Sequence, residues 1–178
     1  MKEIILKNNK KLLIRKARKE DAGELINYVN EIAGESDFLT FGPGEFNITV
    51  EKEKEILEGY LYSNNKIYII ALIDDEIVGS LNFGGGHRPR IMHTGEFGVS
   101  VSKRYWGLGI GKELIKYLID WAHDSNVIKK INLRVREDNK RAIELYKKLG
   151  FKEEGKITRD FFVNDKYYSS IQMGLELD

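Results

Sequence analysis

Short apolar runs rich in β-branched residues alternate with segments of helical periodicity along the chain. The apolar runs predict strands over residues 11–17, 66–73, 76–85, 95–102, 131–135, 151–163 and 166–177. Apolar positions three or four residues apart predict helices over 22–32, 50–62, 114–122 and 140–149. This order, βααβββαβαββ, predicts an α/β (α+β) fold with a mixed central sheet and helices on both faces.

Residues at the element ends agree with these boundaries. Thr49 and Asn139 precede two of the helices and are typical N-caps, and Gly150 follows the last helix as a typical C-terminal stop. The tight sequences DDE and ND predict turns between strands, at 74–76 and 164–165. Two irregular loops remain, over 34–47 and 86–93.

Composition narrows the class of protein. A chain of 178 residues is long enough for one buried core, so we expect one domain over residues 1–178. The 29 basic and 28 acidic residues nearly cancel, which argues against nucleic acid or an anionic membrane as partner. No cysteine is present, which excludes disulfides and fits a cytoplasmic setting. We expect no metal, and no apolar run approaches the roughly 20 residues that span a bilayer.

Gly107, Gly109 and Gly111 stand at alternate positions immediately before a long amphipathic run that predicts a helix. Such a turn lets backbone N–H groups converge at a helix N-terminus, where they bind phosphate or pyrophosphate. The alternative is a tight turn that only packs a strand against a helix. Because no GK[ST] follows the glycines, this is not a Walker A loop, and no chain-initial βαβ unit supports a Rossmann site.

Three stretches together resemble the GNAT superfamily of N-acetyltransferases, in particular the branch of ribosomal-protein and spermidine acetyltransferases. They are GEFGVSVSKRYWGLGIG, NKRAIELYKKLGF and FFVNDKYYSSIQMGL. The resemblance runs over nearly the whole chain. It implies a GNAT fold with a mostly antiparallel mixed sheet, and acetyl-CoA as co-substrate.

In that family the pattern [QR]xxGx[GA] binds the pyrophosphate of coenzyme A. Trp106 takes the Gln/Arg position here, Gly107 and Leu108 are the variable pair, and Gly109 and Gly111 are the small residues. Trp106 lacks the polar side chain of the Gln or Arg that the pattern has at this position. The pyrophosphate must then be bound mainly by backbone N–H groups, those of Leu108, Gly109, Ile110, Gly111 and Lys112. The resemblance adds backbone contacts from Val99, Ser100 and Val101 to the pantetheine arm. Asn139 either contacts the cofactor or is only a helix cap.

Transfer of an acetyl group to an amine requires a base for the ammonium and an acid for the departing thiolate. Tyr146 matches the family tyrosine that protonates the sulfur, although its helical spacing also fits a core residue. Glu96 is the main candidate base, because it alternates with the apolar residues of its strand and should point away from them. A solvated carboxylate is the alternative for Glu96. His87, His93 or a water molecule are further candidates for the base.

Four acids, Glu31, Glu35, Asp37 and Glu45, lie where relatives bind the acceptor. They either favour a cationic amine such as a polyamine or are simply exposed loop charge. We expect a small-molecule amine or a protein N-terminal amine as acceptor, and a homodimer stays open. The competing hypothesis is a domain that binds acyl-CoA as a sensor or adaptor without turnover.

Overall fold

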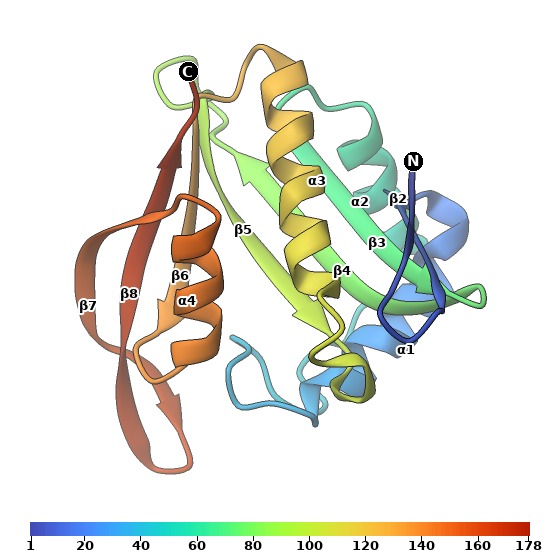
Figure 1. The fold of residues 1–178 in the computed structure, drawn as a ribbon, viewed down its shortest axis with the longest axis horizontal. Helices are drawn as coiled ribbons and strands as arrows, with labels where there is room; N and C mark the ends of the chain where they lie inside the picture. The colour runs from blue at the N-terminus through green and yellow to red at the C-terminus, as the bar shows by residue number, and fades with distance from the viewer.

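The computed structural model describes residues 1–178 as a central sheet with helices on both sides (Figure 1). The strands are β1 (Lys2–Ile5), β2 (Lys11–Lys16), β3 (Lys66–Ile73), β4 (Glu76–Gly85), β5 (Thr94–Val101), β6 (Lys130–Arg136), β7 (Lys152–Val163) and β8 (Lys166–Glu176). The helices are α1 (Ala22–Ala33), α2 (Val50–Leu61), α3 (Ile110–Ser125) and α4 (Lys140–Lys148), with short 3-10 turns at Lys19–Asp21 and Lys103–Tyr105.

The eight strands form one sheet in the order β1-β2-β3-β4-β5-β6-β8-β7. Only β5 and β6 pair in parallel, and every other neighbouring pair is antiparallel. The predicted fold class, a mostly antiparallel mixed sheet covered on both faces, is therefore confirmed.

The two faces of the sheet differ in chemistry. Helices α3 and α4 pack with β3–β6 and β8 around the larger apolar core, which includes the fully buried Leu81 and Phe83. Helices α1 and α2 cover a smaller core over β2 to β4, around Leu25 and Ile70. Beyond that core the same face becomes polar, because alternate residues of β4, β5 and β6 are Ser80, Asn82, Glu96, Gly98, Ser100, Arg134 and Arg136.

The predicted elements are confirmed, and β1 is one that the sequence analysis missed. Thr49 caps α2 by accepting a hydrogen bond from the Lys52 N–H at 3.2 Å. The DD and ND pairs adopt left-handed backbone conformations at both residues, as a two-residue hairpin turn requires. None of the helices is both long enough and apolar enough to cross a bilayer.

Candidate active site

The sheet opens between β5 and β6. Their pairing covers only three positions, from Thr94 opposite Lys130 to Glu96 opposite Asn132. Beyond Glu96 the two strands diverge, so residues 97–101 have a sheet partner on the β4 side alone. Alternate residues of this segment direct their N–H and C=O groups into the opening, where an extended ligand can pair with them.

Side chains bridge the opening on the face covered by α1 and α2. The Nε of Arg134 donates to the Glu96 carboxylate at 3.1 Å, directly where the pairing stops. Further along β6, the buried Arg136 donates to the Asp37 carbonyl at 2.9 Å and lies against the ring of Phe38, 4.4 Å from its centroid. The loop of residues 34–47 is thereby held at the wide end of the opening.

The glycine turn lies where β5 ends and α3 begins. Gly107 and Gly109 have φ values of 88° and 86°, the left-handed region that favours glycine. A Cβ placed on Gly109 would meet no atom within 4 Å, so this turn faces open space. No side chain caps α3, and the N–H groups of Ile110, Gly111 and Lys112 therefore lack the usual capping partner. The arrangement fits an anion such as pyrophosphate.

Two side chains near this turn have contacts that the sequence analysis did not predict. The indole N–H of Trp106 donates to the Val101 carbonyl at 2.7 Å, so Trp106 anchors the turn to the end of β5. The guanidinium of Arg141, on α4, lies 3.9 Å from the position of a Cβ on Gly107. Arg141 has no carboxylate partner, which leaves its charge free for a phosphate. The sequence analysis did not identify Arg141. The only indication in the sequence is that a basic residue stands in the first turn of the helix that follows Asn139.

The three β5 residues assigned to the cofactor divide between the faces. Val99 and Val101 pack against the larger core on the α3/α4 side. The Ser100 hydroxyl lies on the opposite face, 3.0 Å from the Tyr28 hydroxyl and 3.2 Å from that of Ser80, so only its backbone is left for the cofactor. The Oδ1 of Asn139 accepts from the Ala142 N–H at 3.3 Å, and Asn139 is thus a helix cap.

Tyr146 lies on α4, against the start of the opening. Its ring packs edge-on with Phe97 and Phe151, at centroid distances of 6.0 Å from each. Burial raises the pKa of Tyr146 to about 12, so the hydroxyl keeps its proton at neutral pH. The hydroxyl has no hydrogen-bond partner, whereas every completely buried side-chain nitrogen or oxygen of the protein has one. It therefore reaches the surface, where it is available to a ligand.

Glu96 points to the face opposite Phe97, as its place in the strand predicts. Its carboxylate is exposed and paired with Arg134, which in turn lies 3.5 Å from Asp160. Tyr146 and Glu96 therefore approach the same point of the opening, where pairing ends, from opposite faces of the sheet. An acid and a base placed in this way suit a group-transfer reaction, in which the base takes a proton from the nucleophile and the acid gives a proton to the leaving group.

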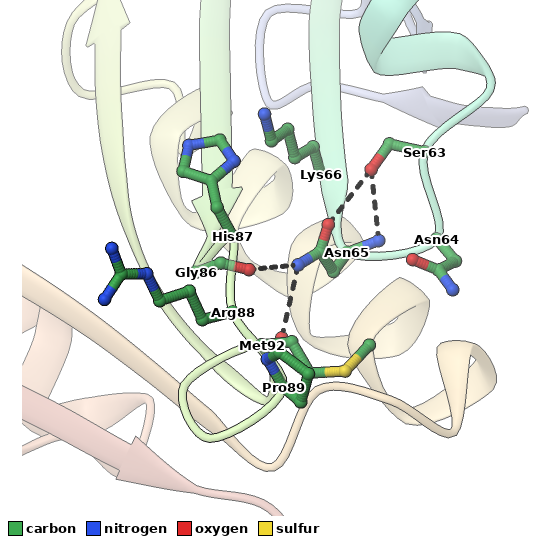
Figure 2. A pocket seen from close by; sticks show the side chains of 9 residues that line it. All are labelled: Ser63, Asn64, Asn65, Lys66, Gly86, His87, Arg88, Pro89 and Met92. Carbon is green, nitrogen blue, oxygen red and sulfur yellow. Dashed lines mark hydrogen bonds between the residues drawn. The ribbon is translucent and has the colours of Figure 1, made fainter.

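The two histidines considered as bases, His87 and His93, precede β5 and lie at its other end. His87 lines a pocket of about 450 Å³ with Lys66 and Arg88 (Figure 2). The His93 side chain is exposed, and only the backbone carbonyl of His93 accepts hydrogen bonds. Asn65 fixes this pocket by donating to the carbonyls of Gly86 and Met92 at 2.9 and 3.3 Å.

The four loop acids do not form an open cluster. The Glu35 carboxylate accepts from the Lys103 N–H at 2.7 Å, and that of Glu45 accepts from the Gly42 N–H at 3.0 Å. Asp37 accepts from Asn164 at 3.4 Å, and Glu31 is exposed. Three of the four are thus used to hold the loop.

Comparison with known proteins shows the class to which this fold and site belong. Residues 27–151 match the model of the acetyltransferase (GNAT) family, so the chain belongs to that family. The crystal structure of a GNAT-family acetyltransferase from Streptococcus pneumoniae superposes with a TM-score of 0.91 at 32% identity, covering 94% of this chain and 99% of the other.

Among named relatives, the chain is 32% identical over 105 residues to the L-amino acid N-acetyltransferase AaaT of Escherichia coli K12. It is 35% identical over 78 residues to the spermidine N(1)-acetyltransferase of the same strain. These matches cover 59% and 44% of this chain, and 65% and 42% of the relatives. The chain therefore spans less than two thirds of the length of either relative.

Proposed function

We propose that this protein is an acetyl-CoA-dependent N-acetyltransferase that acts on a primary amine. The observation that carries the proposal is the opening between β5 and β6, with Tyr146 and Glu96 on its two sides. Family membership supports it, because GNAT proteins use acetyl-CoA. The open turn at Gly107 and Gly109 fits the pyrophosphate, with Arg141 as a cationic partner.

Each residue has a defined task in this proposal. When bound, acetyl-CoA supplies an acetyl thioester. The backbone of Val99 to Val101 holds the extended arm of the ligand, as an added strand would be held. Glu96, directly or through water, takes the proton of the acceptor ammonium, since only the neutral amine has a lone pair. The Tyr146 hydroxyl holds a proton for the departing sulfur.

The competing hypothesis, an acyl-CoA sensor without turnover, makes a different prediction. Both hypotheses expect acetyl-CoA to bind, but only the enzyme releases free CoA thiol when an acceptor is added. The relatives named for L-amino acids and for spermidine define the first acceptors to try. A panel of amino acids, polyamines and peptide N-termini, assayed for thiol release, tests the proposal. Binding of acetyl-CoA with no release for any acceptor would favour the sensor.

A further inference from the structure

Helix α2 carries a buried carboxylate that has no partner. Glu53 is only 3% exposed, and it makes neither a hydrogen bond nor an ion pair. Every side-chain nitrogen or oxygen that is completely buried in this protein has a hydrogen-bond partner. Because the Glu53 oxygens have none, they are not completely buried, and they face a space that solvent reaches. Burial of an unpaired carboxylate is unfavourable, so a cation from outside the chain would stabilise it.

Two tyrosine rings lie near Glu53: Tyr60 is two turns further along the same face of α2, and Tyr68 lies on β3, against which α2 packs. Tyr60 and Tyr68 pack edge to face with their centroids 5.6 Å apart. Burial raises the pKa of each tyrosine, and the negative charge of Glu53 adds to both shifts. No lysine or arginine is among the groups that act on Glu53, whereas Glu55 on the same helix pairs with Lys52 at 2.8 Å. A carboxylate beside aromatic rings is the environment that binds an ammonium group.

This cluster lies on the same face of the sheet as Glu96 and leads to the opening. Tyr68 on β3 pairs with Asn82 on β4, which pairs with the exposed Gly98 on β5. Asn82 reaches towards Gly98, because its Oδ1 lies 3.2 Å from the position of a Cβ on that glycine. Two strand spacings separate Tyr68 from Gly98, about 10 Å.

We propose that Glu53, with Tyr60 and Tyr68, binds a second ammonium group of the acceptor, remote from the amine that is acetylated. The substrate class is then a diamine or polyamine. The inference rests on the proposed function for the identity of the reacting amine, while the ammonium site itself does not require turnover.

The kinetic test compares Glu53→Gln with Glu51→Gln, a matched change at an exposed acid in the first turn of the same helix. Each variant is assayed with α,ω-diamines of increasing length and with monoamines of equal carbon count. We expect Glu53→Gln to raise KM for the preferred diamine about 10- to 100-fold, the usual contribution of a hydrogen bond to a charged group. Monoamine kinetics and Glu51→Gln should stay at the wild-type level. An equal loss for monoamines would place Glu53 at the reacting amine and overturn the proposal.

A binding test needs no turnover. Without acetyl-CoA, diamines should raise the Tm of the wild-type protein more than monoamines do, and Glu53→Gln should abolish the difference. Such a Glu53-dependent shift supports the site even if no amine is acetylated, in which case the proposed function fails alone. Equal shifts by diamines and monoamines in the wild-type protein, or a diamine shift that persists in Glu53→Gln, would overturn the ammonium site whatever the enzyme acetylates.

Discussion

Replacement of Tyr146 by phenylalanine isolates one hydroxyl group. The ring contacts with Phe97 and Phe151, both at 6.0 Å, are unchanged in the variant. Because the hydroxyl has no hydrogen-bond partner in the protein, its removal leaves no buried group unsatisfied. The free energy of unfolding should change by less than about 1 kcal/mol, which corresponds to less than about 4 °C in Tm for a chain of this size.

The rate should respond very differently from the stability. A thiolate is a fair leaving group, with a thiol pKa of about 8.5, so proton donation belongs at the lower end of general acid catalysis. We expect a loss of roughly 10²-fold in turnover, or about 2.7 kcal/mol. The loss should be equal in kcat and kcat/KM if the hydroxyl acts only in the transition state. Since burial raises the Tyr146 pKa to about 12, the loss should not vary between about pH 7 and 9.

The assay is single-turnover acetyl transfer, combined with calorimetric titration of acetyl-CoA and a thermal melt. Tyr62→Phe makes the same change at a tyrosine that is 81% exposed, at the end of α2, and serves as the control. Normal turnover in Tyr146→Phe would refute the role of the hydroxyl as acid and leave Tyr146 as a core residue. A lower Tm with normal turnover would add that the hydroxyl has a structural partner.

Three further perturbations address the rest of the site. Gly109→Asp places a side chain and a negative charge on a left-handed residue of the glycine turn that we propose binds pyrophosphate, so acetyl-CoA affinity should collapse in calorimetric titration. Unchanged affinity would remove the turn from the proposed cofactor site. Glu96→Gln should slow transfer most at pH values where the acceptor is an ammonium, and a flat ratio to wild type across the pH–rate profile would reassign the base. Burial raises the Glu53 pKa above its ordinary value of 4.5, so stability decreases as pH rises from that value to the folded pKa and is constant above it. The Tm of Glu53→Gln relative to wild type should therefore rise as pH increases above 4.5 in calorimetric melts, and a pH-independent difference would contradict this.

Local pattern was sufficient for most of the fold. Helices and strands follow from periodicities of 3.6 and 2, and the caps at Thr49 and Asn139 follow from side chains that bond the next turn. The same period of two placed Glu96 on the face opposite Phe97. Strand β1 was missed because only four residues, Lys2–Ile5, form it at the sheet edge, too few for a periodic signal.

The site itself depends on contacts between distant segments, which a single sequence does not encode in a readable pattern. The opening arises because pairing of β5 with β6 stops after three positions. Arg141 comes near Gly107 only when α4 docks. Glu53 lies in the charged run VEKEKEIL, where it resembles the solvated acids around it, and only the packing of α2 on β3 distinguishes it.

The short parallel contact between β5 and β6 also bears on how the protein assembles. The strands before it and those after it form two antiparallel ladders, each stabilised by contacts within its own part of the chain. Three backbone pairs join the ladders, together with side-chain contacts such as those of Tyr146 with Phe97 and Arg134 with Glu96. Pairing of β5 with β6 brings together segments that are far apart in the sequence. Because this pairing has a high cost in chain entropy, we expect it to form late in folding. The opening exists only after both ladders have docked. Recovery of acetyl-CoA binding after denaturation therefore reports the last step of folding, and it should lag behind the return of secondary structure.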